Sequence, residues 1–200
     1  MKEIELEQQQ KKELHNKLWK MANSLRGNMD ANEFKDYILG LIFYRYICEH
    51  EESEFKDKLH ASIEEVYKEA PENCKELAIS NLGLGYFIEP KYLFKNLVKE
   101  ISTGNFELEM LSNAFKNYSD STKGQVSEDQ LSGLFNDVNL TSDKLGKTYK
   151  EKGELIGKLI SSIDEIDFNF MDSRIDLLGD AYEYLIGQFA ASAGKKAGEF

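Results

Sequence analysis

One segment constrains the fold more than any other, because residues 34–48 are apolar on nearly every side. Asp30 followed by Glu33 has the spacing of a capping box, which predicts that a helix begins there. A helix without a polar face must be surrounded by other helices. We therefore predict a central helix in an all-α fold. Its apolar residues are Phe34, Tyr37, Ile38, Leu39, Leu41, Ile42, Phe43, Tyr44, Tyr46 and Ile47.

Most of the remaining chain also repeats apolar residues every three or four positions, the period of an α-helix. Ser127 and Gln130 form a second capping-box spacing, whereas residues 117–127 are polar and are predicted to be an exposed loop. Two glycines and a proline predict a loop near 83–90 with at most a short extended piece. We predict a single helical bundle-like domain of roughly seven to nine helices. Besides the central one, they lie at 11–26, 49–69, 92–101, 106–118, 127–138, 155–163 and from about 172 to 189.

The 200-residue chain carries a formal charge of −11, and 41% of its residues are hydrophobic. This charge opposes electrostatic capture of nucleic acid or of an anionic membrane by the chain as a whole. No apolar run reaches the length of about 18 residues that a membrane helix needs, and the polar start does not resemble a signal peptide. Cys48 and Cys74 indicate reduced thiols. We expect a cytoplasmic protein without a membrane partner.

No catalytic or metal-binding residue is predicted. His15, His50 and His60 are scattered, and a Gly-Leu-Gly turn at 83–85 lacks the third glycine of a dinucleotide loop. The acids between 164 and 183 are more typical of a solvated face, or of a face docking on a basic partner, than of acid–base catalysis, which needs a cleft. They are Asp164, Glu165, Asp167, Asp172, Asp176, Asp180 and Glu183.

Two groups of basic residues are candidates for contacts with phosphates. Five lysines and three acids in residues 143–158 give a local charge of +2 beside Tyr149, and a second group lies on the first predicted helix. The alternative interpretation is that these are ordinary solvated helix faces. The DNA-contact candidates are Lys17, Lys20, Arg26, Lys144, Lys147 and Lys150.

Two stretches carry a resemblance to a known family. Residues 18–47 read LWKMANSLRGNMDANEFKDYILGLIFYRYI, and residues 176–190 with 194–200 read DLLGDAYEYLIGQFA and GKKAGEF. Both closely resemble the modification subunit (HsdM) of type I restriction–modification systems. Weaker similarity lies at 134–138 and 144–146.

The resemblance implies an S-adenosylmethionine-dependent DNA methyltransferase that acts on adenine N6. In that family Gly-Glu-Phe continues into Tyr-Thr-Pro, a glycine-rich cofactor turn and an Asn-Pro-Pro-Phe motif, and this sequence contains neither the turn nor Asn-Pro-Pro. We therefore expect an N-terminal helical domain at 1–189, and at 190–200 a linker with the first residues of a methyltransferase domain that the sequence does not include. Glu199 and Phe200 would be its only cofactor-motif residues. The cofactor would belong to the longer parent, and this chain alone would be inactive.

The resemblance also implies partners, namely the specificity subunit, a second modification subunit and the restriction subunit, with duplex DNA bound only in the assembled complex. Two alternatives remain open at this point. One is a free-standing helical adaptor or regulatory protein. The other is a small enzyme that uses the carboxylates at 164–183.

Overall fold

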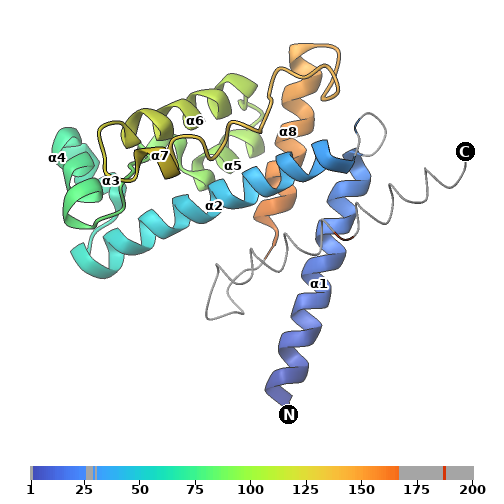
Figure 1. Ribbon diagram of the computed structural model, residues 1–200, viewed down its shortest axis with the longest axis horizontal. Coiled ribbons are helices and arrows are strands. Elements are labelled where there is room, and N and C mark those ends of the chain that lie inside the picture. Colours follow the sequence, from blue (N-terminus) through green and yellow to red (C-terminus); the bar gives the residue numbers. More distant parts are fainter. Residues whose placement is uncertain (1, 26–28, 30, 167–186, 188–200) are drawn as a thin grey trace, which may run out of the picture.

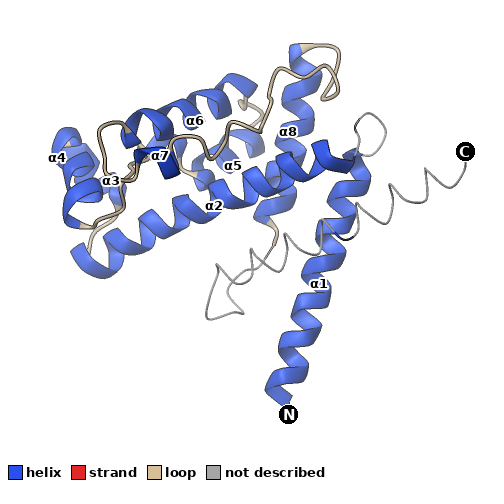
Figure 2. Ribbon diagram, viewed as in Figure 1, coloured by secondary structure: helices blue, strands red, loops and turns tan. Residues whose placement is uncertain are grey.

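The computed structural model describes residues 2–25, 29, 31–166 and 187, and this part of the chain contains helices and no strand (Figures 1 and 2). The prediction of an all-α, bundle-like fold is confirmed. Eight α-helices are described, with a π-helical turn η1 (Leu77–Asn81) after the fourth and a 3-10 turn η2 (Pro90–Tyr92) before the fifth. The α-helices are α1 (Lys2–Leu25), α2 (Ala31–Leu59), α3 (Ile63–Glu69), α4 (Pro71–Glu76), α5 (Phe94–Ser102), α6 (Leu108–Thr122), α7 (Glu128–Leu131) and α8 (Tyr149–Asp164).

Helix α2 is the central helix that the sequence predicts. It contacts α1, α5 and α8, and in Figure 1 it runs the length of the helical layer formed by α3 to α6. Ile38, Leu41 and Ile42 are at most 1% exposed. Tyr44 is fully buried, and its hydroxyl donates to the carbonyl of Tyr92 at 2.6 Å. The helix continues well past the apolar segment, to Leu59, and Phe55 in this later part is also buried.

An aromatic cluster joins α2 to α6 and to the segment that follows α7. The rings of Phe115 and Phe135 stack with centroids 4.6 Å apart, and Tyr44 meets both edge-on. Gly40 contributes to this junction, because a β-carbon at that position would clash with the side chain of Val138. The absence of a side chain at Gly40 therefore lets residues 135–138 lie directly on α2.

The irregular segment 86–89 lies between α2 and α6, and side chains rather than a sheet satisfy its backbone. Tyr86, Phe87 and Ile88 are buried, so their polar groups cannot rely on water. The Tyr86 hydroxyl donates to the carbonyl of Ile47 at 2.8 Å. Three successive backbone N–H groups donate to side chains of the flanking helices: Phe87 to Ser121 Oγ at 3.0 Å, Ile88 to Glu51 Oε1 at 2.9 Å and Glu89 to Asn117 Oδ1 at 3.1 Å.

This arrangement corrects the prediction of an exposed loop at 117–127. Helix α6 continues to Thr122, and Tyr118, Ser121 and Thr122 are buried. The polar residues that suggested a loop instead bind backbone groups inside the fold. Ser121, for example, accepts from Phe87.

Three other local predictions also change. Helix α7 begins after Ser127 as predicted, but Ser127 (φ −94°, ψ 10°) lacks the extended backbone of a cap and its side chain caps nothing. The predicted Ser127–Gln130 capping box is therefore wrong. Pro71 begins α4, a helix that was not predicted between 69 and 92, and α1 starts at Lys2 rather than near 11. The Asp30 cap and the predicted helix near 172–189 lie outside the described residues.

Candidate nucleic-acid interface

The lysines at 144, 147 and 150 gather on one ordered loop at the start of α8. All three are exposed, and the neighbouring Leu145 is 3% exposed and anchors the loop in the core. Thr148 caps α8 through a full capping box with Glu151, a signal that the sequence contains and that the sequence analysis missed. The structure therefore places this predicted group together, on a helix start with a fixed geometry.

The second basic group is not joined to the first. Lys17 lies on α1 and forms a salt bridge with Glu13 at 3.5 Å, and Lys20 is exposed. Arg26 lies outside the described residues. In Figure 1, α1 extends downward from the side on which α2 begins, while the loop before α8 lies at the top of the view. The two described candidate lysines of α1 therefore lie on a different element from the three lysines at the start of α8.

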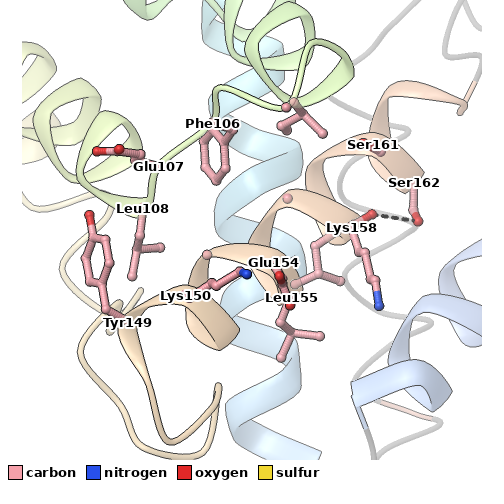
Figure 3. Close-up of a pocket in the computed structure, with 15 residues that line it drawn as sticks. Phe106, Glu107, Leu108, Tyr149, Lys150, Glu154, Leu155, Lys158, Ser161 and Ser162 are labelled. Atoms are coloured by element: carbon pink, nitrogen blue, oxygen red, sulfur yellow. Dashed lines mark hydrogen bonds between the residues drawn. The ribbon is translucent and has the colours of Figure 1, made fainter.

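A hollow of about 980 Å³ lies beside the loop, between α8 and the connection from α5 to α6 (Figure 3). Tyr149 ties its two walls together, because its hydroxyl accepts the Glu109 N–H at 2.8 Å. Gly157 of α8 is buried beside Phe106 and Ile101, where a β-carbon would make ordinary contacts at 3.6–3.8 Å. The lining combines apolar side chains with both signs of charge: Phe106, Leu155, Lys150, Lys158, Glu107 and Glu154. These two lysines and two acids balance, so the hollow does not attract a polyanion by itself.

Arg45 of α2 fixes the other end of α8, and the sequence analysis did not anticipate this role. Its Nη1 donates to the carbonyls of Ile163 and Ile166 at 2.6 and 2.7 Å, and its Nε donates to Glu49 at 2.9 Å. A cation at a helix C-terminus satisfies carbonyls that have no partner within the helix. Arg45 therefore joins the C-terminal end of α8 and the following Ile166 to α2.

Buried Glu51 is another polar residue whose position was not predicted from the sequence. Its side chain is 0% exposed, and Oε2 has no hydrogen-bond partner, while Oε1 accepts from Ile88. Burial raises the pKa of Glu51 well above its ordinary value; the Ile88 N–H opposes this shift, and the nearby acids Glu52 and Glu64 add to it. Burial likewise raises the pKa of the neighbouring Cys48 thiol. Glu51 lies one helical turn from Cys48, inside the core rather than at an open site, so it serves the fold.

The remaining predicted sites are only partly covered by the structure. Asp164 borders a shallow hollow with Glu49 and Glu52, and Glu165 is exposed. The other five acids of the 164–183 group lie outside the described residues, as do Glu199 and Phe200. Within the described ranges, no three His, Cys, Asp or Glu side chains come together as a metal site, and no helix is long and apolar enough to cross a membrane.

Comparison with known proteins identifies relatives of the whole chain. The model of the HsdM N-terminal domain family matches residues 14–163, and that of the N-6 DNA Methylase family matches residues 173–200. The type I restriction enzyme MpnII methylase subunit of Mycoplasma pneumoniae is 36% identical and aligns with 96% of this chain and 37% of its own length. The MjaIX methylase subunit of Methanocaldococcus jannaschii is 28% identical, over 94% of this chain and 33% of its own.

A solved structure supports the same relationship. The methyltransferase subunit of the type I restriction–modification system from Streptococcus thermophilus superimposes with a TM-score of 0.74 at 30% identity, covering 90% of this chain and 39% of that one. The chain thus spans between a third and two fifths of the length of these relatives. Because a family model covers most of the described helical core, the chain belongs to the HsdM N-terminal domain family of type I restriction–modification methylase subunits.

Proposed function

We propose that this chain acts as the helical assembly domain of a type I modification subunit, contacting neighbouring subunits and helping to enclose DNA. The observation that carries the proposal is the match of residues 14–163 to the HsdM N-terminal domain, since these residues also form the closed helical core. A fixed helical scaffold with an amphipathic hollow and an ordered basic loop suits a role in binding partners. A free-standing adaptor is less well supported, because similarity continues into the N-6 DNA Methylase model at 173–200.

The division of the chain and the use of a cofactor are part of the same proposal. We assign residues 1–189 to the helical domain and residues 190–200 to the link toward a methyltransferase domain. S-adenosylmethionine-dependent methylation of adenine N6 would belong to the longer polypeptides that the relatives represent, in which Glu199 and Phe200 would begin the cofactor motif. Methylation of a base inside duplex DNA requires the base to be flipped into a pocket, which we do not assign to these 200 residues.

The proposed partners are the specificity subunit, a second modification subunit and the restriction subunit, in the cytoplasm. Duplex DNA would be contacted only locally, through the basic loop, because the chain as a whole carries a charge of −11. Partner subunits must therefore supply most of the attraction for DNA.

Mixing the chain with the specificity subunit of its own system tests this assembly role. We expect the two proteins to elute together from a sizing column, with a mass by light scattering equal to a defined complex. The specificity subunit of an unrelated restriction–modification system serves as the control. Separate elution of the matched pair at concentrations of roughly 10 µM, where specific interfaces are normally occupied, would contradict the proposal.

A further inference from the structure

We propose that residues 139–152 form a preorganised loop for the sugar–phosphate backbone of duplex DNA, in which Lys147 and Lys150 contact phosphates while Glu151 and Lys152 act as positioning residues. This inference rests on the proposed local contact with DNA and names the residues that make it. Its basis is that the charged side chains of this basic segment divide into two sets, one bound within the loop and one exposed.

The carboxylate of Glu151 binds the backbone at Lys147 and fixes its position. Its Oε2 accepts the N–H groups of Lys147 at 2.7 Å and Thr148 at 3.2 Å, while Thr148 Oγ1 accepts the Glu151 N–H at 3.2 Å. The carboxylate therefore faces the backbone, at the N-terminus of α8, where a negative charge is favoured. An acid in the middle of the basic segment thus organises the loop, and its charge is partly offset by the N–H groups it accepts.

The ammonium group of Lys152 bonds to residues of the loop itself. Its Nζ donates to the carbonyl of Thr141 at 2.9 Å and to Asp143 at 3.1 Å, and its side chain is only 14% exposed. These bonds tie the beginning of the loop to the first turn of α8 and pair the charge of Lys152 with that of Asp143, whose side chain is 92% exposed. The exposed lysines of the loop are Lys144, Lys147 and Lys150, and the last two lie on either side of the Thr148 cap.

Gly146 supplies independent evidence that the loop is closely fitted to α8. A β-carbon at this position would lie 2.6 Å from Glu151 Cβ and 3.0 Å from both Glu151 C and Lys152 N. Two of these neighbours are backbone atoms that cannot move aside, so only glycine allows the approach. Nearby, Asn139 Oδ1 accepts the Thr141 N–H at 3.0 Å, which braces the start of the loop. A loop held at this many points loses little conformational entropy when it binds a ligand.

Variants of the 200-residue chain test both parts of the inference. Binding to a fluorescent duplex of about 20 base pairs is measured by anisotropy from about 20 to about 200 mM salt, where each phosphate contact contributes roughly one unit to the slope of log K against log salt. Exchanging Lys147 and Lys150 together for Gln should reduce the slope by about two. Gly146→Ala should reduce it with no change of charge. Gly153→Ala is the matched control, because its new β-carbon meets nothing closer than 3.7 Å.

Lys152→Met keeps the inference testable if Gly146→Ala fails to fold. Since Lys152 is not exposed to a phosphate, its loss should lower the slope only by freeing the loop, and hydrogen exchange at the Lys147 and Thr148 amides should then be faster. The control is Lys158→Met on the same helix, which removes the same charge but should leave the exchange of these two amides unchanged.

The outcomes separate the two claims. If the unaltered chain shows no salt-dependent binding even at about 20 mM salt, the proposed DNA contact itself fails. If the chain binds but the double Gln variant keeps its slope, the contact lies elsewhere and this inference is overturned alone. If Gly146→Ala or Lys152→Met speeds amide exchange but leaves the slope unchanged, the positioning role is refuted. Equal binding to polyglutamate of matched charge would refute recognition of the phosphate backbone.

Discussion

Replacing Glu51 by Gln removes an ionisable group from the core without changing its shape. The Gln carbonyl can accept the Ile88 N–H as Glu51 Oε1 does at 2.9 Å, so the hold on residues 86–89 is retained. Glu51→Ala would be a different perturbation, because it leaves that buried N–H without an acceptor, at a cost of about 1–3 kcal/mol.

The expected effect of Glu51→Gln depends on pH, and its sign follows from the raised pKa. The folded chain favours the neutral acid, whereas the unfolded chain ionises near the ordinary value of 4.5. The stability contributed by this preference is complete below pH 4.5 and is lost as the pH rises through the folded pKa. Over that interval the wild type loses up to about 1.4 kcal/mol per pH unit, and the Gln variant does not. The free energy of unfolding of the Gln variant should therefore increase relative to that of the wild type as the pH rises.

Urea unfolding of both proteins between about pH 5 and about pH 8 measures this difference. Glu76→Gln is the matched control, because it makes the same exchange at an exposed position. A constant difference between wild type and Glu51→Gln across the same range would refute the assignment of a neutral buried acid.

Three other predictions concern the core, the end of α8 and DNA. Ile42→Asp places an unpaired charge at a position only 1% exposed and should abolish cooperative thermal unfolding near the wild-type midpoint; an unchanged melt would refute the central position of α2. Arg45→Met removes the donors to the carbonyls of Ile163 in α8 and of Ile166 just after it, and should cost about 1–3 kcal/mol in urea unfolding; unchanged stability would refute the anchoring role. Titration with duplex DNA near physiological salt should show no binding tighter than about micromolar, and nanomolar affinity would contradict the local contact.

The central helix could be predicted because its signal is strong and local. Fifteen residues with almost no polar face, such as the segment around Ile38 and Ile42, have few alternatives to burial on all sides. The stop at Thr103 and Gly104 was also predictable, and Gly104 adopts the positive φ that ends helices.

The residues that were mispredicted are polar residues with tertiary partners. Glu51 lies in a strongly charged stretch and has no local feature that marks it as buried; only the arrival of Ile88 from elsewhere in the chain explains it. Ser121 and Asn117 belong to a polar stretch that predicted an exposed loop. Their hydrogen-bond partners, Phe87 and Glu89, are distant in sequence, so the sequence did not show that these side chains bond inside the fold. Periodicity describes which face of a helix is apolar, and it carries no information about such bonds.

The candidate site was predictable in composition but not in organisation. The lysine-rich stretch at 143–158 was identified from charge alone, and it does form one loop and helix start. The local charge of this stretch counts Lys152 together with the other four lysines, whereas the structure shows that Lys152 is bound to Thr141 and Asp143. The fit at Gly146 was not foreseeable, because it depends on how close the loop comes to α8.

Equilibrium dialysis of the folded chain against radiolabelled S-adenosylmethionine tests the central claim most directly. If these 200 residues are an assembly scaffold and the methyl donor is held elsewhere, the ligand should distribute equally across the membrane at concentrations up to roughly 100 µM. Saturable uptake of one molecule per chain, with a dissociation constant near or below about 1 µM, would contradict the account.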